Sequence, residues 1–193
     1  MVSISIVSHN QGLLIAKLLS DLQMHCLKEI EVILTINTNE KLPFTKSDFN
    51  FPLCLIQNKA KKGFGTNHNK AFNHAKGQFF CVLNPDIRLN ANPFPALINC
   101  FENKAVGVVA PLIKDENGKI AENARKFPTP LILFKKLLPP KRKYDYSIGL
   151  DIFSPDWVGG MFMLFPYKVF KAIGGFDEKY FLYYEMKCFK PLL

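Results

Sequence analysis

The sequence predicts an α/β domain built on a largely parallel sheet. Short apolar runs of strand length alternate with segments of helical periodicity, and polar residues or glycines follow most of the apolar runs. The composition agrees with a globular fold, because 48% of the 193 residues are hydrophobic and 21% are charged. Such a chain can bury enough apolar surface to offset the entropy lost on ordering, so global disorder is excluded.

The first 110 residues carry the clearest alternation of strands and helices. We expect one helix at the leucine repeat that follows residue 12, one from about residue 67 to residue 76, and one from Pro93 through Phe101. Apolar runs predict strands at residues 2–8, 31–36, 53–56, 78–83 and 106–110. In a sheet of this kind, ligands bind beyond the carboxyl ends of the strands.

The alternation weakens after Pro111. Residues 115–118 have the composition of a hairpin turn. Residues 125–143 contain seven basic side chains and no acidic one, mixed with leucine, isoleucine and phenylalanine. This segment could lie on an anionic membrane surface with its lysines towards the headgroups, or it could be a core-facing helix with a solvated basic edge.

The formal net charge of +9 favours anionic partners, which include nucleic acids, phosphorylated metabolites and anionic membranes. The basic residues follow no known nucleic-acid-binding motif, so we expect at most weak, salt-sensitive binding to nucleic acid. The five cysteines are widely spaced among apolar neighbours and predict reduced core thiols. Without a signal peptide or a spanning apolar stretch, the sequence predicts a cytoplasmic protein.

Two turns in the first half could meet a phosphorylated ligand. Asp86 follows an apolar strand and is held by Pro85, so its carboxylate could bind Mg²⁺ or Mn²⁺, although Asn-Pro-Asp is also ordinary turn chemistry. Gly63 and Gly65 precede a helix and could present backbone N–H groups to phosphate. The full dinucleotide-binding and P-loop patterns are absent, which excludes both of those site types.

The second half of the chain contains aromatic residues next to acidic ones. The aromatic cluster at residues 180–184 ends in Glu185, and Trp157 precedes a pair of glycines. Aromatic faces beside carboxylates suit sugar rings, which offer C–H faces and hydroxyl groups. An aromatic core strand is the alternative interpretation of the same cluster.

Taken together, these segments resemble the family 2 glycosyltransferases, and among them the rhamnosyltransferase-like enzymes of bacterial surface polysaccharides. The short motifs occur in the family's order over nearly the whole chain. The matching motifs are residues 6–10, 62–69 with 75–77, 83–86, 158–160 with Phe162, and 174–178 leading to Glu185.

The resemblance implies a GT-A fold with a central, mostly parallel sheet flanked by helices. It implies a single glycosyltransferase domain over residues 1–193, in which residues 1–110 bind the nucleotide sugar and residues 111–193 face the acceptor. It also implies an inverting transfer of a sugar from a nucleotide-diphosphate donor, with dTDP-rhamnose favoured and UDP-sugars as alternatives. The acceptor would be a hydroxyl of a lipid-linked or oligosaccharide surface glycan, reached at the inner face of the cell membrane.

Roles for individual residues follow from the same resemblance. Asp86 would hold Mg²⁺ or Mn²⁺ on the diphosphate, and Glu185 would be at or beside the catalytic base. The residues around the nucleotide sugar would be Ser8, Asn10, Asn37, Gly63, Gly65, Asn69, Asn84 and Asp86. The residues at the acceptor pocket would be Trp157, Gly159 and Gly160.

The sequence departs from the family pattern at two positions and at its end. Met186 stands where an Asp is expected as the base, and Ile36 precedes Asn37 where an Asp that contacts the nucleotide is common. Relatives generally continue beyond the position of Leu193, so we expect a truncated product that is incomplete on the acceptor side. Two alternatives remain open: a catalytically impaired remnant that only binds nucleotide sugar, and, more remotely, a basic nucleic-acid-binding module.

Overall fold

The computed structural model describes residues 1–26, 29–120, 123–126, 146 and 152–181. Contacts divide the chain into two compact units, one formed by Met1–Pro111 with Met161–Leu193 and the other by Leu112–Gly160. Most of the basic segment at residues 125–143 lies outside the described residues, so its two interpretations stay open.

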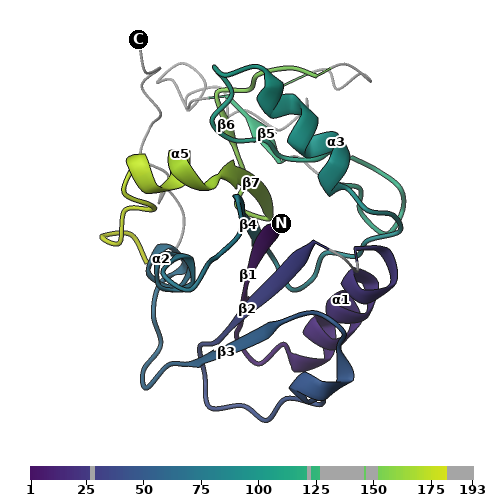
Figure 1. Cartoon of the computed structure of the whole chain (residues 1–193), viewed down its shortest axis with the longest axis vertical. Helices are drawn as coiled ribbons and strands as arrows, with labels where there is room; N and C mark the ends of the chain where they lie inside the picture. The colour runs from purple at the N-terminus through teal and green to yellow at the C-terminus, as the bar shows by residue number, and fades with distance from the viewer. Residues whose placement is uncertain (27–28, 121–122, 127–145, 147–151, 182–193) are drawn as a thin grey trace, which may run out of the picture. The chain divides into compact units, whose positions relative to one another are not determined.

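The first unit is built on a five-stranded sheet with the order β3-β2-β1-β4-β7 (Figure 1). Its strands are β1 Val2–Ser8, β2 Ile30–Ile36, β3 Leu53–Gln57, β4 Phe79–Leu83 and β7 Phe162–Pro166. The first four run parallel to one another, and β7 is antiparallel to β4. The sheet is therefore mostly parallel, as the sequence predicts.

Helices cover both faces of this sheet. In Figure 1, α1 and α3 lie on one side, and α2 and α5 lie on the other. The rings of Phe80 and Phe170 are 4.8 Å apart between centroids on one face, whereas Phe79 stacks on Phe101 at 5.6 Å. The helices are α1 Gly12–His25, α2 Phe64–Phe72, α3 Phe94–Asn99 and α5 Tyr167–Ala172, with 3₁₀ turns η1 Lys46–Asp48 and η2 Cys100–Glu102.

The strands at the centre of the sheet are apolar because both faces are covered. Every residue of β2 is buried, including Glu31, whose carboxylate accepts hydrogen bonds from the Ser3 hydroxyl and the Lys76 backbone N–H. β1 pairs with β2 along its whole length, from Val2 opposite Ile30 to Ser8 opposite Ile36. This register brings the carboxyl ends of β1 and β2 to the same level.

The second unit contains a short antiparallel pair, β5 Ala124–Arg125 and β6 Trp157–Val158. The turn at residues 115–118 is confirmed, because Lys114 and Ile120 form an antiparallel bridge and the Gly118 N–H donates to the Asp115 carbonyl. In the part of the chain that the structure describes, none of the helices has the length and hydrophobicity of a membrane-spanning segment.

Two predicted elements differ from the structure. The strand expected at residues 106–110 is reduced to a single bridge between Val109 and Leu164 of β7, and β7 takes the place beside β4 in the sheet. The helix expected at residues 67–76 begins at Phe64 and ends at Phe72. Beyond Phe72, the N–H groups of His74 and Ala75 donate to carbonyls three residues earlier, so the α-helical pattern stops there.

Candidate functional site

Polar residues gather at the carboxyl ends of the four parallel strands. Ser8 ends β1, Asn37 follows β2, Asn58 follows β3 and Asn84 follows β4. Because these strands are parallel, the four residues lie along one edge of the sheet, where α/β folds bind their ligands.

Three buried asparagines fix the loop at residues 58–62 on this edge. Asn37 Oδ1 accepts hydrogen bonds from the Lys62 N–H at 2.8 Å and from Asn58 Nδ2 at 2.9 Å. Asn58 Nδ2 also donates to Asn67 Oδ1 at 2.7 Å, and Asn67 Nδ2 donates to the Lys62 carbonyl at 3.1 Å. β2, the loop and the first turn of α2 are therefore connected through side-chain amides.

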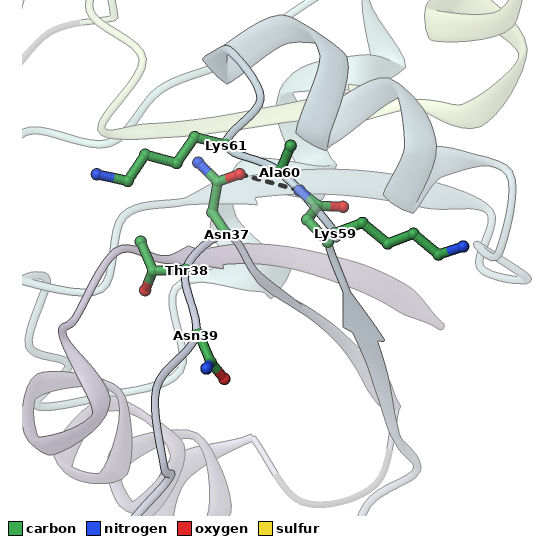
Figure 2. Close-up of a pocket in the computed structure, with 7 residues that line it drawn as sticks. Asn37, Thr38, Asn39, Lys59, Ala60 and Lys61 are labelled. Atoms are coloured by element: carbon green, nitrogen blue, oxygen red, sulfur yellow. Dashed lines mark hydrogen bonds between the residues drawn. The ribbon is translucent and has the colours of Figure 1, made fainter.

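An open pocket of ≈ 200 Å³ lies beside this network (Figure 2). Its volume suits one part of a larger ligand, such as a nucleobase or a sugar ring. The side chains of Lys59 and Lys61 extend in opposite directions from the loop, so the pocket is flanked by positive charge. The pocket is lined by Asn37, Thr38, Asn39, Asn58, Lys59, Ala60 and Lys61.

The turn after β1 is tied to the segment after β2. Asn10 adopts a left-handed backbone conformation with φ of 62°, which asparagine tolerates better than most residues. Its N–H donates to Glu40 Oε1 at 3.0 Å, and its Oδ1 accepts from the Thr38 hydroxyl at 2.9 Å. Ser8 is fully buried, and its Oγ accepts a weak hydrogen bond of 3.4 Å from the Gln11 N–H.

Asp86 is exposed and lies in the turn that follows β4. The Asn84 N–H donates to the Met161 carbonyl at 2.9 Å, and the Asn84 carbonyl accepts from the Ile87 N–H at 3.3 Å, which closes the turn. No group of three or more His, Cys, Asp or Glu side chains among the described residues could hold a metal ion. A lone carboxylate fits a hard cation that takes its remaining ligands from substrate phosphates and water.

The chain beyond Asp86 is anchored to α1 by an ion pair. Arg88 Nε and Nη2 donate to the two carboxylate oxygens of Asp21 at 2.6 and 2.8 Å, and the Leu89 N–H donates to Asp21 Oδ2 at 3.0 Å. The hydrogen bond from Arg88 holds the pKa of Asp21 below its usual value. The pair was not predicted from the sequence, although Asp21 is an acidic residue inside the leucine repeat of α1.

The first turn of α2 contacts a segment distant in sequence. Gly63 and Gly65 are buried, and a Cβ added at Gly63 would lie 2.7 Å from the Phe181 carbonyl oxygen. The Phe64 N–H donates to that same oxygen at 2.9 Å. This N–H is therefore engaged by the protein, although we expected the turn to offer its N–H groups to phosphate.

His68 lies in the middle of α2 and is buried. It is 1% exposed, its Nδ1 shares a 2.7 Å hydrogen bond with the Ser5 hydroxyl, and its ring packs edge-on against Phe64 and Phe176. Burial lowers its pKa to about 3. At physiological pH, His68 is therefore neutral and is a packing residue on the buried side of α2.

The remaining predicted site residues belong to other elements of the chain. Asn69 faces the turn at residues 174–178, and its Nδ2 donates to the Phe176 carbonyl. Trp157 and Gly159 belong to the second unit, with Gly160 at its end. In that unit, Trp157 Nε1 donates to the Lys126 carbonyl and the Gly159 N–H donates to the Asn123 carbonyl. Glu185 and Met186 lie outside the described residues.

Comparison of the sequence with known families matches the description "Glycosyl transferase family 2" over residues 3–166. The chain is 28% identical to rhamnosyltransferase WbbL of Escherichia coli, over 96% of this chain and 74% of that protein. It is 23% identical to an N-acetylglucosaminyl-diphospho-decaprenol L-rhamnosyltransferase of Mycobacterium tuberculosis, over 93% of this chain. The chain spans only 66% of the length of that mycobacterial protein.

Solved structures share the fold. The mannosyltransferase PcManGT from Pyrobaculum calidifontis, in complex with GDP-Man and Mn²⁺, superposes with a TM-score of 0.62 at 18% identity. S. aureus TarS 1-349 in complex with UDP-GlcNAc superposes with a TM-score of 0.57 at 17% identity. Each match covers 91% of this chain but only 47% and 48% of the respective solved chain. Together with the family match, these structures confirm the predicted GT-A fold.

Proposed function

Since the chain belongs to glycosyl transferase family 2, we propose that it transfers a sugar from a nucleotide-diphosphate donor to a hydroxyl of a surface glycan. The pocket at residues 37–39 and 58–61 is the observation that carries this proposal. It opens at the carboxyl edge of the parallel strands, its loop is fixed by buried amides, and lysines flank it. These features suit a polar, anionic ligand such as a nucleotide sugar.

We assign the nucleotide-sugar side of the reaction to the sheet edge. Asn37 would act by holding the pocket loop, because its Oδ1 already accepts two hydrogen bonds. Thr38, Asn39 and the backbone of the loop would then be the groups that meet the base. Ser8, Asn10, Gly65 and Asn84 would support the adjoining turns.

Asp86 would hold a divalent cation, Mg²⁺ or Mn²⁺, together with the donor's phosphates. Its exposure at the carboxyl end of β4, next to β1 in the sheet, supports this role. When bound, the cation would neutralise the negative charge that develops on the leaving diphosphate. The solved mannosyltransferase with GDP-Man and Mn²⁺ shares this fold, which supports the same proposal.

The transfer would proceed in one step with inversion. The acceptor hydroxyl oxygen forms a bond to the anomeric carbon as the bond from that carbon to the diphosphate oxygen breaks, and the diphosphate leaves with the electron pair. The hydroxyl proton passes to a carboxylate on the opposite face, a role that we assign to Glu185.

Rhamnose from dTDP-rhamnose is the favoured donor group, with UDP-sugars as alternatives. The two rhamnosyltransferase relatives support this choice, and the name of the mycobacterial protein supports a lipid-linked acceptor. Trp157, Gly159 and Gly160 would border the acceptor. We further propose that residues 1–193 act as one glycosyltransferase domain at the inner face of the cell membrane.

A second candidate function is binding of nucleotide sugar without turnover. Met186 favours it, because an Asp is expected at this position in the family and a methionine cannot accept a proton. The two candidates predict the same pocket and differ only in the chemical step.

Release of the nucleotide product distinguishes these candidates. The full chain is incubated with dTDP-rhamnose, UDP-galactose or UDP-glucose, with Mn²⁺ and with a membrane extract that contains lipid-linked glycans. We expect acceptor-dependent release of dTDP, and its loss when Glu185 is replaced by Gln. Binding of the donors without any release would establish the second candidate, and neither binding nor release would contradict both.

A further inference from the structure

Asn69 connects α2 to a turn more than 100 residues later in the chain. Its Nδ2 donates to the Phe176 carbonyl at 2.9 Å and to Glu178 Oε1 at 2.9 Å, while its Oδ1 accepts from the Phe176 N–H at 2.9 Å. Both polar atoms of the side chain are thus engaged by the turn. The reciprocal pair of bonds with Phe176 fixes the distance and the direction of that backbone.

Two consecutive glycines shape the turn for this contact. Gly174 and Gly175 have φ of 74° and 73°, a conformation that glycine adopts without steric cost. A Cβ added at Gly175 would lie 2.3 Å from Asn69 Oδ1, whereas a Cβ added at Gly174 would meet nothing within 4 Å. Gly175 is therefore required both by its backbone conformation and by the approach of Asn69.

A second contact holds the same segment at the start of α2. The Phe64 N–H donates to the Phe181 carbonyl, and Gly63 leaves room for that backbone. The rings of Phe64 and Phe176 pack edge to face at 5.5 Å between centroids. We call residues 174–181 the arm, because α2 holds it near both of its ends.

We propose that Asn69 is a positioning residue that holds the arm against α2 for sugar transfer, and that it makes no contact with the nucleotide. The inference rests on the proposed function, in which Glu185, four residues after the arm, takes the acceptor's proton. The loop that lines the pocket leads directly into α2, so α2 joins the donor side of the site to the arm. Loss of the Asn69 side chain would impair turnover while leaving the pocket intact.

The test compares Asn69→Ala with Asn73→Ala, which removes the same side chain from an exposed position one turn further along the chain. Hydrogen exchange of the full chain should become about tenfold faster in the arm of Asn69→Ala, and unchanged in Asn73→Ala and in β1. The dissociation constant of dTDP or UDP with Mn²⁺ should change by less than about twofold, and kcat should fall about tenfold at constant KM.

A glycine pair tests the same contact from the other side. Gly174→Ala and Gly175→Ala introduce the same backbone strain, but only Gly175→Ala places an atom against Asn69. Gly175→Ala should therefore accelerate exchange in the arm more than Gly174→Ala does. In the Asn69→Ala background this difference should disappear, because the clash is gone.

The proposal is overturned if Asn69→Ala weakens nucleotide binding about tenfold while exchange in the arm stays as in the parent. That result would make Asn69 a ligand contact. A parent chain that binds no nucleotide would contradict the proposed function instead. The exchange rates and the glycine pair would still decide whether Asn69 holds the arm, since neither measurement needs a ligand.

Discussion

At the scale of single residues, His68 makes folding sensitive to pH. Its burial lowers its pKa to about 3, whereas an unfolded histidine has its ordinary pKa of about 6.5. Between these values the unfolded chain binds a proton that the folded chain does not. The free energy of unfolding should therefore fall as the pH falls from about 6.5, by up to about 1.4 kcal/mol per pH unit.

His68→Asn tests this dependence, since Asn cannot take up the proton but can still bond to the Ser5 hydroxyl. We expect the urea midpoint of this variant to vary less between pH 7 and pH 4 than that of the parent. His74→Asn is the matched control, because His74 is exposed. If the urea midpoints of the parent and of His68→Asn changed equally between pH 7 and pH 4, His68 would not be the cause of the pH dependence.

Asp21 should make the stability of the fold depend on pH at lower pH values than His68 does. Arg88 lowers its pKa below the ordinary value of 3.8, so its contribution to stability is complete above that value and is lost as the pH falls through the lowered pKa. Asp21→Asn should lower the urea midpoint at pH 7, and the gap between variant and parent should narrow below pH 3.8. Glu102→Gln, at an exposed carboxylate, should leave the midpoint at pH 7 unchanged. If the difference in urea midpoint between Asp21→Asn and the parent stayed constant below pH 3.8, the charge on Asp21 would not be stabilising.

At the scale of elements, an aromatic cluster joins α2, α5, β4 and β7. Phe170 is 1% exposed and lies within 5.3 Å, between ring centroids, of Phe72, Phe80, Phe165 and Phe176. Phe170→Ala should lower the free energy of unfolding by roughly 3–5 kcal/mol, because it leaves a cavity among these rings. Leu13→Ala, at a side chain that is 73% exposed, should change it by less than about 0.5 kcal/mol. Similar losses in the two variants would contradict this account of the core.

Some strands of the sheet could be predicted from the sequence and one could not. The strands at β1 to β4 were predictable because buried parallel strands are continuous apolar runs with polar residues after them. The strand at β7 was not: it takes the place beside β4, while residues 106–110 form one bridge to β7. Local pattern does not reveal which of two apolar runs takes the free edge of a sheet.

Only part of the candidate site could be predicted, because its hydrogen bonds join residues that are distant in the sequence. Asp86 stood out because it follows a predicted strand, whereas Asn37 was assigned through the family resemblance alone. The bonds that join Asn37 to Asn58, and Asn69 to Phe176, connect residues 21 and 107 positions apart. The first pairing depends on the register of β2 and β3, and the second on the packing of α2 against the turn at residues 174–178, and a single sequence specifies neither. Roles for the site residues remain predictions to be tested by ligand binding.

At the scale of the whole molecule, the net charge of +9 predicts association with anionic surfaces. The chain should co-sediment with vesicles that contain phosphatidylglycerol, and this binding should weaken as salt increases. Vesicles of phosphatidylcholine alone serve as the control and should bind little. Equal binding to both vesicle types would contradict an electrostatic origin, and no binding to either would contradict the proposed place at the membrane.

The carboxyl edge of the sheet, in our proposal, binds a nucleotide diphosphate with a cation on Asp86. Calorimetric titration of dTDP and of UDP into the full chain, with Mn²⁺ and again with a chelator, tests it most directly. We expect one nucleotide to bind with Mn²⁺ and to bind at least about tenfold more weakly with the chelator or with Asp86→Asn. Glu102→Gln removes the same charge elsewhere and should bind as the parent does. Equal affinity with and without the chelator, or in Asp86→Asn, would contradict the account.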